Sequence, residues 1–372
     1  MKFFVERDAL LRAMDHARRI VESRHTIPIL GNVALLVGSA GLVIRATDLD
    51  LQVETTCPAD VVTAGAATVA VGTLFDLLKR LPSGCSVTLE QEAAGRVVVR
   101  SGRSRVGLPT LPFSDFPELR LAGDAHEFAL PGKELSRMLG AVNFAISTEE
   151  TRIYLNGIYL QAMHPEDGAA VLRAVASDGH RLAMIDMPAP EGCAGMPSLI
   201  LPRKAQHEFA KLADAVGDGP VSLSVHASGV RASALGTVLT TKIIDATFPD
   251  YQRLIPVGND RHLTVTSDHL RGALDRALIV IAERGNAVKL SIEAEQVTVT
   301  VDGSGGEVRE EIDAELDGSP IDVGFNAKYG RAIIDALESD TLRIDLGDPG
   351  SPMIWRRGGN DGPLCLLMPM RV

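Results

Sequence analysis

The chain repeats the same short patterns at a spacing close to one third of its length. Asn32 and Asn156 each follow a short apolar run, and they lie 124 positions apart (156 minus 32) in a chain of 372 residues. Two further pairs of segments recur in the same order, ATDL at 46–49 with ASDG at 176–179 and DFPE at 115–118 with TFPD at 247–250. A chain built from copies of one unit usually derives its function from how the copies are arranged.

Length and composition set the class of protein. With 45% hydrophobic residues in 372, the chain can bury two or three cores, and thirds of about 124 residues match a common domain size. The first residues, Met1 to Glu22, carry charges throughout and lack the apolar centre of a signal peptide. No stretch approaches the roughly 20 apolar residues of a membrane span. We therefore expect a soluble, cytoplasmic protein.

Cysteine spacing and net charge exclude several kinds of site. The four cysteines are far apart, which fits neither a disulfide framework nor a CxxC metal site, and we expect buried, reduced thiols at Cys57, Cys85, Cys193 and Cys365. A formal net charge of -11 and an aromatic content of 4% argue against a protein that grips nucleic acid tightly or stacks on its bases. If this protein acts on DNA, we expect it to bind DNA only weakly.

Each third contains two units in which a short strand leads into an amphipathic helix. The first units are predicted at 2–5 with 8–21, 127–130 with 133–144, and 263–265 with 268–281. The second units are predicted at 67–71 with 74–81, 199–201 with 204–215, and 321–323 with 328–337. Alternating runs predict further strands at 41–47, 95–100, 221–225, 288–292 and 296–301. Asp8 and Asp268 are the expected N-caps. Two helices on one face of an antiparallel sheet in each third make an α+β fold.

Seven motifs carry a resemblance to a known family. They are PILGN at 28–32, SGRSR at 101–105, YLNG at 154–157, SDGHRLA at 177–183, PRK at 202–204, FPDYQRLIP at 248–256 and MPMRV at 368–372. In this order, and together with the opening MKFFVER, they resemble the bacterial sliding clamp, the beta subunit of DNA polymerase III, over the whole chain. The resemblance implies three similar DNA-clamp domains per chain, at 1–122, 123–255 and 256–372, in a head-to-tail dimeric ring.

The implied function is that of a processivity factor with no catalytic site of its own. The ring-shaped homodimer would encircle double-stranded DNA without regard to sequence. It would tether the DNA polymerase III alpha subunit, the clamp loader, and other polymerases and repair proteins through a short peptide motif. Twelve helices side by side at about 10 Å spacing give a circle about 38 Å across. Subtracting about 5 Å of helix radius on each side leaves about 28 Å, enough for a duplex of roughly 20 Å.

Family positions also give the site residues that the resemblance implies. The residues expected to face DNA are Arg24, Arg80, Tyr154, Arg203 and Lys204. Further basic candidates for the inner wall are Arg12, Arg18, Arg19, Lys79, Lys133, Arg137 and Arg276. The pocket for partner peptides is expected at Leu155, Ser177, Gly179, His180, Arg181, Leu182, Pro249, Arg253, Leu254, Pro352, Leu366, Met368, Pro369, Met370 and Arg371. The dimer interface is expected at Val106, Leu108, Ile279 and Val280.

Some of these residues admit other interpretations. Ser177, Asp178 and His180 contain the side chains of a catalytic triad, but they are crowded within four positions and no GxSxG elbow is present. His164 is not at ligand spacing from His180, so no metal site is expected, and no P-loop, dinucleotide fingerprint or HExxH motif points to an enzyme or cofactor. The MPMRV tail could be a terminal core strand. The alternative function is a monomeric scaffold, a small-molecule binding protein, or an enzyme with a site between domains.

Overall fold

The computed structural model describes residues 1–22, 24, 26–92, 95–164, 168–281, 286–303, 306–359 and 362–371. The chain divides into two compact units. Unit 1 comprises Met1–Lys133 and His207–Ile243, and unit 2 comprises Glu134–Gln206 and Ile244–Val372. The central third of the sequence therefore contributes to both units.

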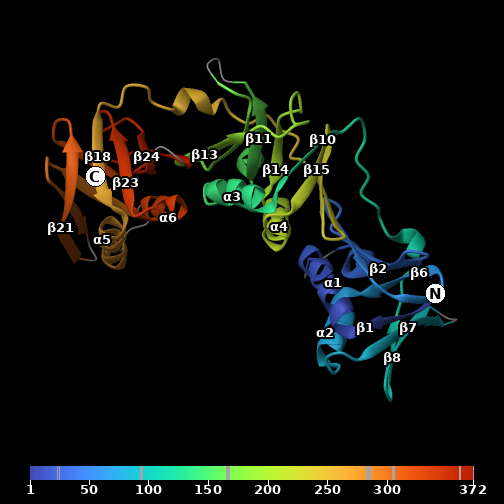
Figure 1. The fold of residues 1–372 in the computed structure, drawn as a ribbon. Helices are drawn as coiled ribbons and strands as arrows, with labels where there is room; N and C mark the ends of the chain where they lie inside the picture. Colours follow the sequence, from blue (N-terminus) through green and yellow to red (C-terminus); the bar gives the residue numbers. More distant parts are fainter. Residues whose placement is uncertain are drawn as a thin grey trace. The chain divides into compact units, whose positions relative to one another are not determined.

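Unit 1 contains two antiparallel sheets with helices α1 (Arg7–Ile20) and α2 (Val71–Arg80) packed against them (Figure 1). The five-stranded sheet has the order β5 (Asp60–Thr63), β1 (Lys2–Glu6), β7 (Ser86–Glu92), β8 (Arg96–Ser101) and β9 (Ser104–Pro109). The eight-stranded sheet has the order β10 (His126–Pro131), β15 (Pro220–His226), β16 (Gly229–Ala234), β17 (Thr237–Lys242), β4 (Leu51–Cys57), β3 (Gly41–Thr47), β2 (Asn32–Gly38) and β6 (Gly65–Ala70). The β17–β4 pairing joins the first and central thirds.

Unit 2 is built on one twelve-stranded antiparallel array. Its order is β14 (Leu199–Pro202), β11 (Gly157–Met163), β12 (Val171–Ser177), β13 (Arg181–Pro188), β25 (Leu364–Leu367), β24 (Met353–Arg357), β23 (Thr341–Leu346), β18 (Arg261–Thr266), β21 (Gly306–Asp317), β20 (Gln296–Gly303), β19 (Ala287–Ile292) and β22 (Ile321–Asn326). Helices α5 (Ser267–Val280) and α6 (Ala327–Leu337) lie wholly in this unit, whereas α3 (Gly132–Asn143) and α4 (Arg203–Val216) cross the boundary between the units.

The helices agree closely with the sequence prediction. The described residues contain six α-helices, and five of them begin and end within one residue of the predicted bounds. Only α2 departs further, because it begins at Val71, three residues before the predicted start. Gly72 lies in its first turn, where a glycine interrupts little of the hydrogen bonding. The predicted apolar face of α1 is confirmed, since Leu10, Met14 and Ala17 are buried.

The predicted N-caps are wrong, because both helices begin one residue earlier than expected. Helix α1 is capped by Glu6, whose carboxylate accepts hydrogen bonds from the backbone N–H groups of Asp8 at 2.9 Å and Ala9 at 2.8 Å. Helix α5 is preceded by Thr266, and Asp268 lies within its first turn. In both cases the strand runs directly into the helix, so the capping position is the last residue of the strand.

Asp8 has a different role from the predicted one. Its carboxylate accepts hydrogen bonds from the Ser83 hydroxyl at 2.6 Å and the Gly84 backbone N–H at 3.0 Å, and it pairs with Arg7. These contacts, led by the Ser83 hydrogen bond, hold the pKa of Asp8 well below its usual range. Asp8 therefore fastens the start of α1 to the loop that follows α2.

The sequence repeat is confirmed at the level of single hydrogen bonds. Asn32 and Asn156 each follow a 3-10 turn, η1 (Pro28–Gly31) and η3 (Ile153–Leu155), and each donates its backbone N–H to the carbonyl three residues earlier. After β3, Asp48 Oδ1 accepts from the N–H groups two and three residues further on, at 3.0 and 2.7 Å. After β12, Asp178 Oδ1 does the same at 2.9 and 3.0 Å. The two turns are copies of one design.

The cysteines fit the predicted burial only in part. Cys57, Cys193 and Cys365 are buried, whereas Cys85 is partly exposed, and all four are free. Burial raises the pKa of Cys57 to about 11 and that of Cys365 to about 12. The expectation of burial is therefore correct for three cysteines and wrong for Cys85, which lies in the loop before β7.

We predict that Gly179→Ala destabilises unit 2. Gly179 has a φ of +87°, and a Cβ there would lie 2.8 Å from Arg152 Nη1. The left-handed backbone alone costs an L-residue roughly 1–2 kcal/mol. Urea unfolding should therefore show a lower free energy of unfolding by about that amount. Gly140→Ala is the matched control, because its Cβ would meet nothing within 4 Å on α3. If both variants are equally stable, the turn does not require glycine.

Candidate binding sites

Pocket residues from three distant segments meet in one hydrophobic cluster of unit 2. Leu155 from η3, Leu182 from β13 and Leu366 from β25 are 5%, 1% and 1% exposed, and Met368 packs against them. The antiparallel pairing of β13 with β25 sets Leu182 directly opposite Leu366. The structure thus brings these four predicted pocket residues together, and the described tail, 368–371, follows β25 without forming part of a strand.

An aromatic group completes the cluster. Tyr159 stacks on Phe248 with ring centroids 4.8 Å apart, and Tyr251 meets both rings edge-on at 6.3 Å. The individual aromatic residues were not predicted as site residues. The signal that could have found them is the FPDY segment of the repeat, which places two aromatic side chains beside a predicted linker. These rings give the cluster a rigid apolar base.

The turn 177–181 is held by its own polar side chains. The Ser177 hydroxyl donates to the Arg181 carbonyl at 2.9 Å and accepts from the Gly179 N–H at 3.2 Å. Asp178 accepts from two turn amides and forms an ion pair with Arg181, with Nε 2.9 Å from Oδ2. Two of the three side chains that suggested a triad, those of Ser177 and Asp178, are therefore engaged in shaping the backbone.

Arg181 connects this turn to two helices. Its guanidinium carbon lies 4.5 Å from the ring centroid of Tyr329 on α6 and 5.2 Å from that of Phe144, which follows α3. Tyr329 also stacks on His180 at 5.9 Å. Burial, together with the Asp178 carboxylate, raises the pKa of Tyr329. Tyr329 was not predicted from the sequence, because nothing in the local pattern relates α6 to a turn about 150 residues earlier.

The C-terminal tail is fixed by backbone hydrogen bonds. The Met368 N–H donates to the His180 carbonyl at 2.9 Å, and the Met370 N–H donates to the Gly324 carbonyl at 2.7 Å. These bonds leave the side chains of Met368, Pro369 and Met370 only partly buried. The tail is thus ordered while its side chains stay accessible.

The remaining predicted pocket residues are accessible to different degrees. Pro352 is partly buried. Leu254 is 43% exposed, and Arg253 is exposed and paired with Asp250 at 2.7 Å. The exposed positions are Gly179, His180, Pro249, Arg253, Leu254 and Arg371. A buried apolar floor beside exposed polar and apolar groups is the usual construction of a peptide-binding surface.

Ion pairs divide the basic candidates for a DNA-facing surface into two groups. Four of them are matched to carboxylates within hydrogen-bond distance, namely Arg19 with Glu208, Lys133 with Asp218, Arg137 with Glu134 and Arg276 with Glu310. The Arg19–Glu208 pair also ties α1 to α4, since Glu208 is only 6% exposed. Their positive charges are already balanced.

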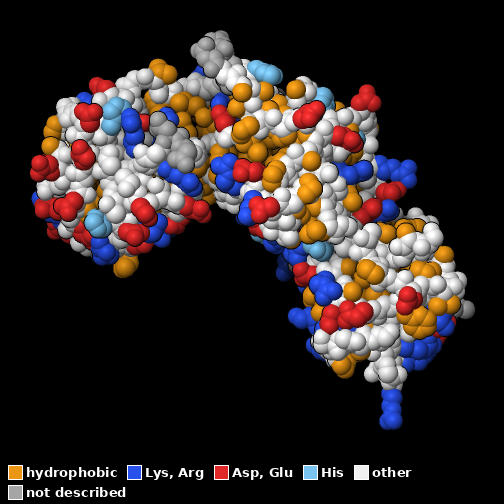
Figure 2. Space-filling model, viewed as in Figure 1, with side chains coloured by type: hydrophobic (Ala, Val, Ile, Leu, Met, Phe, Trp, Pro, Cys, Tyr) orange, Lys and Arg blue, Asp and Glu red, His pale blue; other side chains and the backbone are white. Residues whose placement is uncertain are grey.

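A second group consists of five arginines that have no ion-pair partner within the described ranges. Arg12, Arg18, Arg24, Arg80 and Arg203 are all exposed. Arg80 contacts only a backbone carbonyl, that of Asp76, at 3.0 Å. Tyr154 and Lys204 are partly buried, and Tyr154 packs against the pocket cluster. Basic and acidic side chains lie interspersed on the surface of each unit in Figure 2. Sequence alone could not separate the two groups, because pairing depends on tertiary contacts.

The predicted interface residues lie beside open strand edges. β9 is the last strand of the five-stranded sheet, and Val106 on it is partly exposed while Leu108 is 4% exposed. In unit 2, Ile279 is 83% exposed, and Val280 lies against the start of β21, where a Cβ on Gly306 would be 3.0 Å away. Leu108 can therefore support an interface only from beneath, whereas Ile279 is available for contact.

Three family models for the DNA polymerase III beta subunit match the chain, for the N-terminal domain at residues 1–120, the central domain at 129–250 and the C-terminal domain at 252–371. The chain therefore belongs to the DNA polymerase III beta subunit family. The clamp is 40% identical to the beta sliding clamp of Caulobacter vibrioides and 34% identical to that of Escherichia coli, with both chains of each pair fully covered. A Bartonella birtlesii sliding clamp solved with griselimycin is 39% identical, has a TM-score of 0.96 and is also fully covered.

Membership in this family establishes what the chain does. It is a DNA sliding clamp, an accessory subunit that encircles duplex DNA as a homodimeric ring, tethers the replicative polymerase and catalyses no reaction of its own. The predicted α+β fold of three clamp domains is confirmed. Within the described part of the chain, no helix has the length and apolar character needed to cross a membrane.

We predict that Arg181→Lys loosens the turn 177–181. Lysine keeps the charge but cannot stack a planar group on two rings or keep the same hydrogen bond to Asp178. The expected loss is about 1–2 kcal/mol in the free energy of unfolding, with faster amide hydrogen exchange at His180 and Arg181. Arg253→Lys is the control, because that side chain is 85% exposed. Unchanged exchange in Arg181→Lys would show that the stack does not hold the turn.

Proposed function

We propose that this clamp binds its partners through the hydrophobic pocket of unit 2, with the residues named above as its wall. The observation that carries the proposal is the convergence of Leu155, Leu182, Leu366 and Met368 on one cluster with an ordered but accessible tail. Each apolar anchor of a bound peptide could contribute about 1.5–3 kcal/mol. The Bartonella clamp solved with griselimycin supports a ligand-binding site on this fold.

For DNA, we propose a weak contact made by arginines without carboxylate partners. Arg24 and Arg203, which lie in family motifs, are exposed, as is Arg80, and we add the exposed Arg12 and Arg18 of α1. We assign Tyr154 and Lys204 a supporting role beside Arg203. A few phosphate contacts give a salt-sensitive, sequence-independent attraction that permits sliding, while the ring prevents escape. The cations that are already paired contribute little.

For ring closure, we propose that β9 of one protomer pairs with the first half of β21 in its partner. In the described register, residues 307–313 of β21 pair with β20, and pairing with β18 begins at Ala314. The opposing edges differ in charge. Exposed Arg96, Arg103 and Arg105 lie on or beside β9, where Arg105 pairs with Glu92, and exposed Glu307, Glu311 and Asp313 outnumber the single Arg309 on the first half of β21, where Arg309 pairs with Glu311. Unlike charges favour head-to-tail over like-to-like pairing. Val106, Ile279 and Val280 would cover the junction, with Leu108 beneath.

We also propose the domain boundaries and the location of the clamp. Domains at 1–122, 123–255 and 256–372 are supported by the residues that the three family models match. A cytoplasmic location is supported by the replication role of the family. We propose that the clamp functions without a cofactor or metal.

The test of the function is topological. After loading onto nicked circular DNA by a clamp loader with ATP, the protein should stay on the circles and should be lost when a single-cutting nuclease linearises them. The physical reason is that a closed ring leaves only over a free end. Uncut circles carried through the same steps are the control. Retention that does not respond to linearisation would mean direct chemical binding and would support the monomeric scaffold.

Two sets of changes should separate the DNA surface from the pocket. Arg24→Ala with Arg203→Ala should weaken retention on DNA and reduce its dependence on log salt by about 2, because each phosphate contact contributes about 0.9. Peptide binding should be unchanged. Deleting 368–372 should abolish peptide binding while the ring still closes. Equal loss of both activities in either protein would contradict the division of roles.

Ile279→Lys should weaken the dimer without destabilising the protomer. The side chain is 83% exposed, so a lysine there is solvated in the monomer but desolvated in the proposed seam. In sedimentation experiments across a concentration series, the variant dimer should dissociate into protomers at a higher protein concentration than the unmodified dimer does. Val257→Lys is the control, since Val257 is fully exposed outside the seam. Identical dimer affinities for the two variants would remove Ile279 from the interface.

A further inference from the structure

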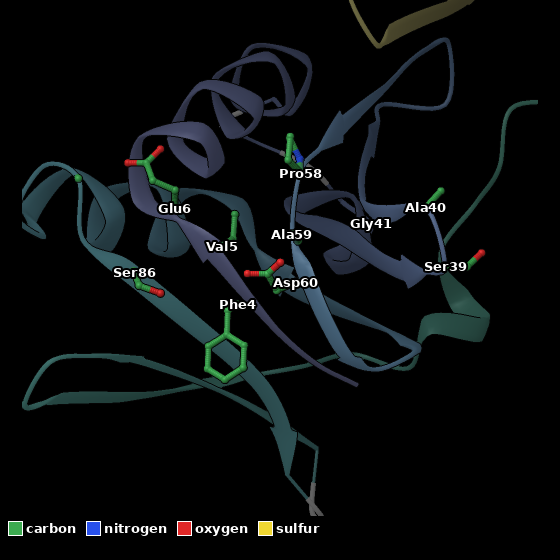
Figure 3. Close-up of a pocket in the computed structure, with 11 residues that line it drawn as sticks. Phe4, Val5, Glu6, Ser39, Ala40, Gly41, Pro58, Ala59, Asp60 and Ser86 are labelled. Carbon is green, nitrogen blue, oxygen red and sulfur yellow. The ribbon is translucent and has the colours of Figure 1, made fainter.

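A hollow lies on unit 1, and none of its lining residues is assigned above to the peptide pocket, the DNA contact or the dimer interface. It has a volume of about 600 Å³ and is lined by β1, the β2–β3 turn, the connection into β5 and the start of β7 (Figure 3). The lining residues in the argument are Phe4, Val5, Glu6 and Asp60. All of them belong to the same compact unit. This volume is within the range of ligand-binding hollows in proteins.

The lining is acidic and partly aromatic. It contains the carboxylates of Glu6 and Asp60 and the hydroxyls of Ser39 and Ser86, and neither lysine nor arginine is part of it. Glu6 is committed to capping α1. Asp60 has no hydrogen bond or ion pair from its side chain to any residue that the structure describes. The one uncommitted charge in the hollow is therefore negative.

Phe4 and Asp60 are direct partners on neighbouring strands. The β1–β5 register sets Phe4 opposite Asp60, and Figure 3 shows the two residues next to each other. Phe4 is 39% exposed, an unusual position for a phenylalanine, and Val5 behind it is buried. An aromatic face beside a free carboxylate is suited to a lysine or arginine side chain, through cation–π and ionic attraction together.

The hollow adjoins an open strand. β5 is the last strand of its sheet and all four of its residues are exposed. Val62 is 58% exposed, and the β1–β5 register passes from Val61 to Thr63 without a partner for it. An exposed edge of this kind can accept a further strand, whose main chain bonds to the edge while alternate side chains enter neighbouring pockets.

We propose that this face of unit 1 docks an extended, basic segment of a partner protein. A lysine or arginine of the segment lies between Phe4 and Asp60. The charge of the hollow selects this occupant over an acidic one. The surface would give the clamp a second docking site that is independent of the pocket in unit 2.

The probe is a fluorescein-labelled, acetylated Lys-Val-Lys-Val-Lys-Val peptide, followed by fluorescence anisotropy with the full chain. Asp60→Lys should weaken binding roughly tenfold, since it removes the ionic attraction and repels the probe. Asp124→Lys is the matched control, because it changes the net charge equally at an exposed position outside the hollow. Phe4→Leu should weaken binding by a smaller factor.

Each outcome has a defined meaning. Loss in Asp60→Lys but not in Asp124→Lys supports the site. Equal loss in both shows nonspecific attraction to an acidic protein and overturns the proposal, as does an absence of binding to the unmodified chain. If the clamp associates beyond the dimer and only Asp60→Lys abolishes that association, the occupant is a second copy of the chain. This result would also overturn the proposal. Retention on circular DNA should be the same in all variants, so failure here is distinguishable from failure of the clamp function.

Discussion

The candidate pocket depends on one strand pairing, that of β13 with β25. Four consecutive residue pairs, from Arg181 with Leu367 to Met184 with Leu364, join the sheet of the central third to that of the last third. This pairing sets Leu182 beside Leu366 and directs the chain past His180, whose carbonyl then fixes Met368. Because the tail follows β25 directly, any shift of register would move every tail side chain relative to the turn 177–181.

Much of the architecture could be predicted because it depends on short sequence patterns that recur along the chain. Helix positions follow from apolar periodicity, and the turns at Asp48 and Asp178 follow from short polar motifs that satisfy their own backbone. The N-caps were mispredicted because the preference of a single residue does not determine where a helix begins. Aspartate is a good capping residue in isolation, but the strand enters the helix without a turn, and Glu6 occupies the capping position first.

Residues of the candidate site could be predicted only where the resemblance to the family identifies them. Leu155, Leu182 and Leu366 were identified by resemblance, and the structure brings them together. Tyr329 was missed, because its role arises from stacking on Arg181, a contact between segments far apart in the sequence. The pairing of individual arginines was equally hidden, since a carboxylate such as Glu208 approaches Arg19 only after folding. Long-range contacts of this kind leave no local pattern.

Charge pairing also reconciles an acidic chain with a DNA-encircling function. A formal net charge of -11 would oppose a protein that had to bind phosphate by affinity alone. A ring held by topology requires only enough attraction to centre the duplex, and stronger binding would slow its sliding. Carboxylates that neutralise Arg19, Lys133, Arg137 and Arg276 keep the number of uncompensated cations small. Two of these ion pairs also connect elements within a unit, Arg19–Glu208 between α1 and α4 and Arg276–Glu310 between α5 and β21, so the pairing that would moderate the proposed attraction for DNA also contributes to the packing of these helices.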